Sequence, residues 1–146
     1  MLDENQFCTF HVDDLYLGVE VVQVQEVLRF QDMTHVPTAP AAVDGLINLR
    51  GQIVPAIDLR TCLGLPPRPE GQRPMNVVVR LEDGACSLLV DEIGDVVEVE
   101  ADTFEAPPQN LAEAARGLIR GVYKMDGSLL LILDTEAALA LDVVVA

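Results

Sequence analysis

The chain has 146 residues, of which 50% are hydrophobic and 4% aromatic, and it contains no tryptophan. This length allows one domain, or two small lobes on a common core, to remove well over half of its surface from water, and aliphatic side chains must fill that core. The formal net charge of -15 repels phosphate backbones and anionic lipid headgroups. Nucleic acids and membrane surfaces are therefore poor candidate partners.

The cysteines and the N-terminus indicate a reducing compartment. Cys8, Cys62 and Cys86 are scattered and lack C-x-x-C spacing, which argues against a disulfide framework and against a zinc site. The first residues lack a basic and apolar leader pattern, and no run approaches the roughly 18 apolar residues of a membrane span. We expect a cytoplasmic protein without a bound metal or cofactor.

The first part of the chain predicts a β-hairpin followed by an ambiguous segment. Residues 7–12 alternate apolar and polar side chains, and Asp13-Asp14 supplies a turn before a second strand over 15–19. Residues 23–28 fit both a strand and a helical face, and we favour a short helix in which Glu26 is exposed. Pro37 and Pro40 then predict an irregular crossing segment.

The stretch from residue 44 to residue 60 predicts two apolar strands joined by a tight turn at Arg50-Gly51. Gly51 tolerates positive φ, so the chain can reverse directly after Arg50 and present its guanidinium. The Arg50 guanidinium is either an exposed charge suited to docking or a structural salt-bridge partner. Pro55 cannot donate to a ladder, which favours an edge or a bulge. A helical turn ended by Gly64 follows, and the proline-rich residues 66–74 are the best internal boundary.

The second part of the chain predicts two further hairpins. The first hairpin has strands over 75–81 and 85–90, joined by a turn at Glu82-Asp83-Gly84. A further strand over 93–99 and a proline-containing crossing segment over 104–110 follow. The second hairpin has strands over 118–124 and 129–133, joined by a turn at residues 125–127. Residues 135–141 predict a C-terminal helix.

The two sides of the proline-rich segment share a weak internal repeat. The Asp13-Asp14 turn and its following strand resemble those at Asp83-Gly84, and residues 45–59 resemble residues 117–135. A repeat of this size predicts two similar small barrels whose apolar faces meet. We expect one domain over 1–146, with lobe 1 over about 14–70 and lobe 2 over about 75–146. The N-terminal strand is a candidate to join lobe 2.

No catalytic pattern is present in the sequence. Phosphate-binding glycine loops and a nucleophile elbow are missing, and His11 and His35 lack metal-ligand spacing. The acidic pairs Asp91-Glu92 and Glu98 with Glu100 are interpreted as solvated strand faces. Each of Asp58 and Asp134 is predicted to cap the helical turn that follows it.

The residues from Asn48 to Arg60, preceded by Val36-Pro37-Thr38-Ala39-Pro40 and Gly45-Leu46-Ile47, resemble the signature of the CheW coupling proteins of bacterial chemotaxis. The resemblance extends to residues 24–27, 89–97 and 130–134. It implies an all-β fold with short helices, in which two five-stranded SH3-like barrels pack on a shared hydrophobic core.

The resemblance also implies a non-catalytic scaffold that couples the cytoplasmic tips of chemoreceptors, the methyl-accepting chemotaxis proteins, to the regulatory domain of the histidine kinase CheA. Such an adaptor would be cytoplasmic and recruited to membrane receptor arrays. The partner-binding positions that it implies are Arg50, Glu26, Val24, Gly45, Ile93 and Val96. From the exposed Arg50 corner we expect Arg50→Ala to weaken coupling without unfolding the protein.

Two alternatives remain open at the level of sequence. The high acidity, with Asp44 where the family pattern is often basic or neutral, leaves room for the same fold in a non-chemotactic pathway of motility or development. A more remote alternative is an enzyme with Cys62 or Cys86 as nucleophile. Because no receiver or kinase domain is present, we expect a stand-alone adaptor.

Overall fold

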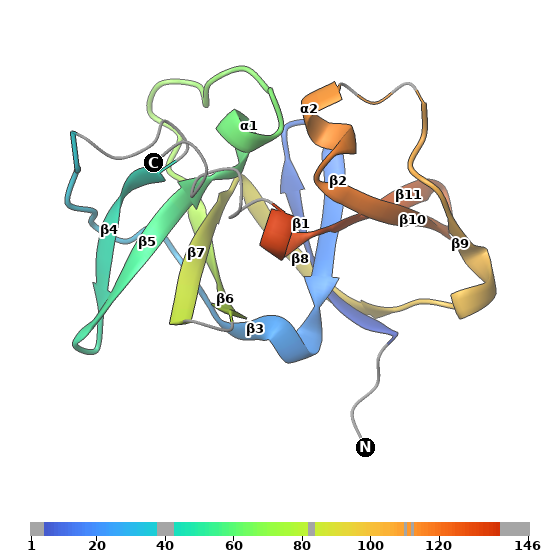
Figure 1. Cartoon of the computed structure of the whole chain (residues 1–146), viewed down its shortest axis with the longest axis horizontal. Helices are drawn as coiled ribbons and strands as arrows, with labels where there is room; N and C mark the ends of the chain where they lie inside the picture. Colours follow the sequence, from blue (N-terminus) through green and yellow to red (C-terminus); the bar gives the residue numbers. More distant parts are fainter. Residues whose placement is uncertain (1–4, 38–42, 82–83, 110, 112, 138–146) are drawn as a thin grey trace.

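The computed structural model describes residues 5–37, 43–81, 84–109, 111 and 113–137. This part of the chain forms two β-sheets that lie beside each other, with short helical turns between strands (Figure 1). The elements in chain order are β1 (Gln6–Val12), β2 (Leu15–Glu20), η1 (Val21–Gln23), β3 (Val24–Leu28), β4 (Val43–Leu49), β5 (Gln52–Asp58), α1 (Leu59–Cys62), β6 (Met75–Leu81), β7 (Gly84–Val90), β8 (Glu92–Glu98), η2 (Ala101–Thr103), β9 (Phe104–Glu105), α2 (Glu113–Arg116), β10 (Ile119–Met125) and β11 (Ser128–Leu133).

The two sheets have the same strand order. The five-stranded sheet runs β3-β6-β7-β5-β4, and the six-stranded sheet runs β8-β1-β2-β11-β10, with the two-residue β9 added at its end. In each sheet a parallel pairing, β5 with β7 or β11 with β2, joins two antiparallel hairpins. The internal repeat predicted from the sequence is therefore present as a repeated topology.

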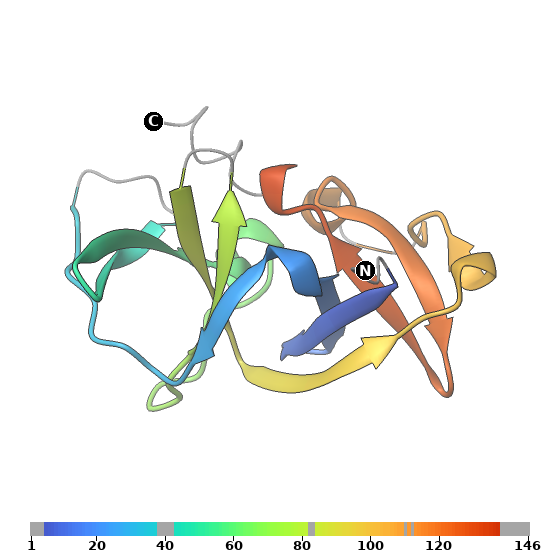
Figure 2. The same cartoon turned by 90° about the horizontal axis from the view of Figure 1, so that it is seen from below.

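The sheets exchange strands, so the division of the chain differs from the one predicted. The hairpin β1–β2 lies in the six-stranded sheet, but the next strand, β3, joins the five-stranded sheet. The hairpin β6–β7 lies in the five-stranded sheet, and β8 crosses to pair with β1 (Figure 2). The predicted lobe boundary at residues 66–74 does not coincide with these sheets, because residues 75–90 pair with strands that precede that boundary.

A central hydrophobic cluster is built from both sheets. Phe10 and Leu17 from the six-stranded sheet and Ile57 and Leu88 from the five-stranded sheet are all fully buried in it. Burying such a side chain stabilises the fold by about 1.5–3 kcal/mol. Each sheet has a further cluster of its own, around Val54 and around Phe7. The predicted shared core therefore exists, with a smaller core on each side of it.

The helix predicted over residues 23–28 is wrong. Residues 21–23 form a 3-10 turn, and Val24 to Leu28 form strand β3, which pairs with β6 from Val24↔Val79 to Leu28↔Asn76. β-branched valines favour a strand, and the tertiary pairing with β6 decides between two local patterns of similar strength.

The hairpins and most turn predictions are confirmed. The side chain of Asp58 caps α1 by accepting from the Arg60 N–H at 3.0 Å, and Asp134 accepts from the Ala137 N–H at 3.1 Å. Gly64 follows α1 with a φ of 72°. The turn residues 82–83 lie outside the described part, as do residues 138–141 of the predicted C-terminal helix, whereas residues 135–137 are helical.

Pro55 lies in an interior strand of the five-stranded sheet, between β7 and β4. The ladder between β5 and β7 covers only Ala56 to Asp58, and on the other side Pro55 pairs with Leu46. Pro55 thus lies in a part of β5 that the β7 ladder does not reach. The edge predicted from Pro55 exists locally, although β5 as a whole is not an edge strand.

Candidate partner-binding site

The turn between β4 and β5 has two residues, and both have positive φ. Arg50 has a φ of 52° and Gly51 a φ of 88°, and the flanking residues Leu49 and Gln52 are paired. Two positive φ angles in a two-residue hairpin loop define a type I′ turn, in which Asn-Gly is the preferred pair. The Asn48 side chain accepts a hydrogen bond from the Gly51 N–H at 3.0 Å. An arginine therefore occupies a left-handed backbone position, which is unfavourable for a residue with a long side chain.

Arg50 and Glu26 form a bidentate ion pair between the β4–β5 turn and β3. Arg50 Nη1 donates to Glu26 Oε1 at 2.9 Å, and Nη2 donates to Oε2 at 2.7 Å. The Arg50 side chain is 77% exposed, but that of Glu26 is 15% exposed. The hydrogen bonds and the charge of Glu26 raise the pKa of Arg50. Glu26 is therefore a shielded strand residue rather than the exposed helix residue that the sequence predicted.

Two exposed aliphatic residues lie close to Arg50 and Glu26 in the sequence. Val27, next to Glu26, is 41% exposed, and Ile53, three residues after Arg50, is 58% exposed. Interfaces concentrate binding energy in a few residues, among which arginine is enriched. We name Arg50 and Glu26 the Arg50 patch, whereas Val27 and Ile53 are exposed residues of the nearby strands β3 and β5.

Two of the predicted partner-binding residues lie on the strands that carry the Arg50 patch. Val24 is partly buried against the central cluster, on the same strand as Glu26. Gly45 is buried on β4, and a Cβ added there would lie 2.9 Å from the Thr34 carbonyl oxygen. Thr34 and Leu46 exchange backbone hydrogen bonds of 2.8 and 2.9 Å at this point. Gly45 thus permits the crossing segment to close against β4.

The other two predicted residues, Ile93 and Val96, lie on β8 in the six-stranded sheet. Ile93 is partly buried against the central cluster, and Val96 is 57% exposed. The structure therefore places Arg50 in contact with Glu26 and puts Ile93 and Val96 on the second sheet. Their roles in partner binding remain predictions.

A second ionic cluster, which the sequence interpretation missed, surrounds Asp91. The Asp91 side chain is 8% exposed, so its interpretation as part of a solvated strand face is wrong. Arg60 Nε and Nη2 donate to its two carboxylate oxygens at 3.1 and 2.6 Å, and Arg68 Nε donates at 3.3 Å. Burial opposes ionisation of Asp91, but these donors, the Asp13 N–H and the arginine charges together lower its pKa. A carboxylate that directly follows a buried apolar strand was the available signal.

The proline-rich residues 66–74 are anchored to the rest of the fold. Arg60 Nη1 donates to the Pro66 carbonyl oxygen at 2.9 Å, and Arg68 reaches Asp91. The Arg73 guanidinium lies 5.2 Å from the centre of the Phe30 ring. This segment is therefore a surface loop that a few contacts hold against the five-stranded sheet's side of the molecule.

Features expected of a metal site, a membrane helix or a catalytic thiol are not found in the described ranges. No group of three or more His, Cys, Asp and Glu side chains in those ranges is arranged to hold a metal ion. No helix in them has the length and apolarity to cross a membrane. Cys62 and Cys86 are buried, which removes the accessible nucleophile that a cysteine enzyme needs.

The CheW-like domain model matches residues 6–142. The chain is 30% identical to chemotaxis protein CheW of Treponema pallidum, over 90% of this chain and 80% of that protein. It is 31% identical to chemotaxis protein CheW of Bacillus subtilis, over 89% and 83%, and 32% identical to protein PilI of Pseudomonas aeruginosa, over 78% and 64%.

The fold matches a solved structure described by the same family name. The scaffolding protein TtCheW from Thermoanaerobacter tengcongensis superposes with a TM-score of 0.79 and 25% identity, over 90% of this chain and 89% of that one. The two sheets are thus the two SH3-like subdomains of that fold. The chain belongs to the CheW family of non-catalytic chemotaxis scaffold proteins.

Proposed function

We propose that this scaffold couples the cytoplasmic tips of chemoreceptors to the regulatory domain of a CheA-type histidine kinase, with the Arg50 patch in a partner interface. The observation that carries the proposal is Arg50 itself. An exposed arginine is held in a left-handed turn position, where asparagine or glycine would be more stable, by a bidentate pair with Glu26. Strained backbone at an exposed position is a mark of function.

The two-sheet architecture supports a connector of two unlike partners. The Arg50-Gly51 turn joins β4 to β5, whereas the equivalent hairpin β10–β11 turns at Asp126-Gly127 without an arginine. Val96 on the second sheet gives a separate exposed apolar position. The net charge of -15 favours partners with basic surfaces. We place the protein in the cytoplasm, recruited to receptor arrays.

A three-component reconstitution tests this proposal. Purified protein is added to a receptor cytoplasmic fragment and a CheA-type kinase, and kinase autophosphorylation is measured alongside pull-down of each partner. We expect binding to both partners and an increase in kinase activity that requires all three components. Absence of binding to receptor and kinase, with the protein folded by circular dichroism, would contradict the proposal.

The similarity to protein PilI favours a second candidate, the same scaffold role in another chemosensory pathway. The assay separates the two candidates when it is repeated with a kinase from a motility or developmental pathway. Stronger activation of that kinase would assign the chain to the second pathway.

A further inference from the structure

Asp91 lies where the chain leaves one sheet and enters the other. It is the single residue between β7, in the five-stranded sheet, and β8, in the six-stranded sheet. The reciprocal crossing runs from β2 to β3 through η1. These two crossings connect the hairpins of one sheet to an outer strand of the other.

Asp91 is bonded to both sheets at this crossing. Its backbone N–H donates to the His11 carbonyl oxygen at 2.9 Å, and its carboxylate accepts from the Asp13 N–H at 2.7 Å. Both of these partners belong to the β1–β2 hairpin of the six-stranded sheet. The same carboxylate accepts two hydrogen bonds from Arg60, on α1, which directly follows β5 of the five-stranded sheet.

The Asp91–Arg60 pair is shielded from solvent and has the geometry of a strong ion pair. The side chains are 8% and 7% exposed, and both carboxylate oxygens are engaged in a fork. Such bidentate pairs fix orientation as well as distance. Arg68, 10% exposed, adds one bond at 3.3 Å, and its Nη2 lies 3.8 Å from Asp58 Oδ1.

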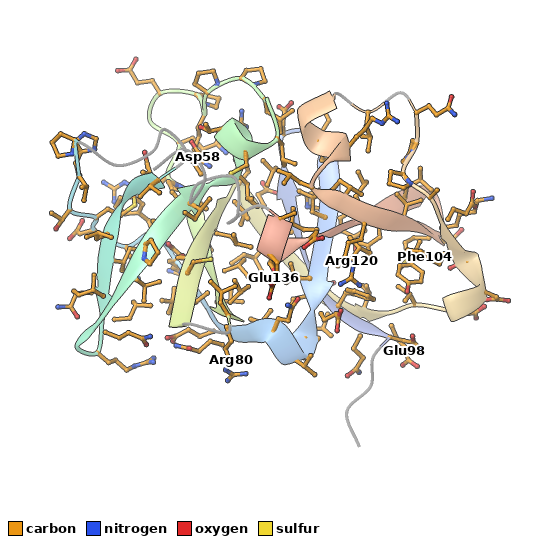
Figure 3. All side chains as sticks on the ribbon, viewed as in Figure 1. Asp58, Arg80, Glu98, Phe104, Arg120 and Glu136 are labelled. Carbon is orange, nitrogen blue, oxygen red and sulfur yellow. The ribbon has the colours of Figure 1, made fainter. Side chains whose placement is uncertain are left out.

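The other crossing is held by weaker contacts. Gln23 Nε2 donates to Thr135 Oγ1 at 3.3 Å, and Arg80 Nη1 donates to the Val22 carbonyl oxygen at 3.4 Å. In the repeat, Asp134-Thr135-Glu136 corresponds to Asp58-Leu59-Arg60, so a glutamate stands where the first copy has Arg60. Figure 3 labels Glu136 in the second copy and Asp58, the first residue of the matching triplet, in the first copy. The crossing from β7 to β8 is therefore held by a buried ion pair, whereas the crossing from β2 to β3 is held by neutral or exposed contacts.

We propose that Asp91 and Arg60 form a lock that sets how the two sheets sit relative to each other, and that Asp91 is a positioning residue for coupling. A connector must hold two partner surfaces at a fixed spacing, and the lock does so from the far end of β5, opposite the Arg50 turn. The coupling part of this inference rests on the proposed function, and the positioning part does not.

A distance measurement tests the lock directly. Spin labels are attached through a ketone-bearing unnatural amino acid at Gln52, on β5, and at Leu129, on β11, which leaves the cysteines unlabelled. Pulsed electron–electron double resonance then gives the distribution of distances between the two spin labels, one on each sheet. We expect one narrow distribution in the parent protein and in Glu92→Gln, which removes a neighbouring exposed carboxylate, and a broadened or shifted one in Asp91→Asn. An unchanged distribution in folded Asp91→Asn overturns the lock.

Arg60→Lys is the second variant, because Asp91→Asn can fail to fold. Lysine keeps the positive charge but cannot form the two-pronged contact, so we expect an intermediate broadening with native circular dichroism. A parent-like distribution in folded Arg60→Lys and failure of Asp91→Asn to fold would together reduce the pair to a stability element and overturn the lock.

The consequence for coupling is measured in the three-component assay. We expect Asp91→Asn to bind receptor fragment and kinase singly with affinities within about twofold of the parent protein. Activation of the kinase by the receptor should fall roughly fivefold or more. A loss of single-partner affinity in proportion to the loss of activation would show a merely structural role. If the parent protein itself does not couple, the proposed function fails, while the distance measurement still decides the lock.

Discussion

At the scale of single residues, two arginines illustrate different uses of charge. Arg50 is largely exposed and held by Glu26 on a strained turn, which suits recognition of a partner. Arg60 is buried and held by Asp91, which suits architecture. Exposed ion pairs contribute little to stability, whereas breaking a buried pair leaves an uncompensated charge. We therefore expect Arg50 substitutions to affect partner recognition, and Arg60 substitutions to affect stability and the relative placement of the two sheets.

The ionisation of Asp91 predicts an acid-sensitive contribution to stability. Its pKa in the folded protein is lowered by Arg60, the Asp13 N–H and Arg68 against the opposing effect of burial, relative to about 3.9 in an unfolded chain. A depressed pKa contributes stability above the unfolded value, and this contribution is lost as the pH falls through the folded value. The difference in unfolding free energy between the parent protein and Asp91→Asn should be constant from about pH 7 to about pH 5 and shrink below about pH 4. Urea unfolding at each pH measures it, and a difference that grows towards acid pH would refute the assignment.

The two arginines bound to Asp91 should differ in importance. Arg60→Met removes the two hydrogen bonds from Arg60 and leaves the Asp91 carboxylate buried. It should lower the free energy of unfolding by about 3–5 kcal/mol. Arg68 Nη2 is buried and donates no hydrogen bond to any of the described residues, so Arg68→Met should cost less than about 1 kcal/mol. Guanidinium denaturation of both variants measures the contrast. Equal losses would show that Arg68 shares the lock.

At the scale of elements, β4 depends on a glycine to receive the crossing segment. A Cβ at position 45 would lie 2.9 Å from the Thr34 carbonyl oxygen and 3.0 Å from Met33 Cβ. The Thr34 carbonyl oxygen accepts a backbone hydrogen bond from Leu46, so it cannot move away without breaking that bond. Gly45→Ala should therefore destabilise the protein by about 1–3 kcal/mol. The exposed neighbour Asp44→Ala is the control. Amide exchange at Thr34 and Leu46, with urea unfolding, measures the effect, and wild-type protection in Gly45→Ala would disprove the steric argument.

The elements that the sequence predicted well are those with local signals. Alternating strands around glycine or aspartate turns give the hairpins, and Gly51 and Gly64 have the positive φ angles that the turns require. β3 was mispredicted because Val24, Val27 and Leu28 have helical spacing as well as strand propensity. The pairing with β6, about fifty residues away in the chain, decided the outcome. Arg50 was singled out correctly as a turn residue, but its own positive φ and its contact with Glu26 depend on the packed barrel.

At the scale of the whole molecule, the exchange of β3 and β8 between sheets makes the two barrels inseparable. The repeat was visible in sequence because both copies use the same hairpin and strand-end patterns. The exchange of β3 and β8 could not be predicted from the sequence, because no local pattern in either strand specifies which sheet it joins. Asp91 escaped notice for the same reason, since its partners Arg60, Arg68 and Asp13 are 23 to 78 residues away. An asymmetric charge device on a symmetric scaffold suits a connector of unlike partners.

The coupling assay with Arg50→Asn tests the central claim most directly. Asparagine suits a left-handed turn position, so the hairpin should be retained and the thermal midpoint should equal or exceed that of the parent protein. Arg120→Gln is the control, because Arg120 forms an exposed 3.3 Å pair with Glu20 on the other sheet, where it is labelled in Figure 3. We predict that Arg50→Asn reduces receptor-dependent kinase activation roughly tenfold or more, while Arg120→Gln stays within about twofold. Parent-like activation by folded Arg50→Asn would contradict the account.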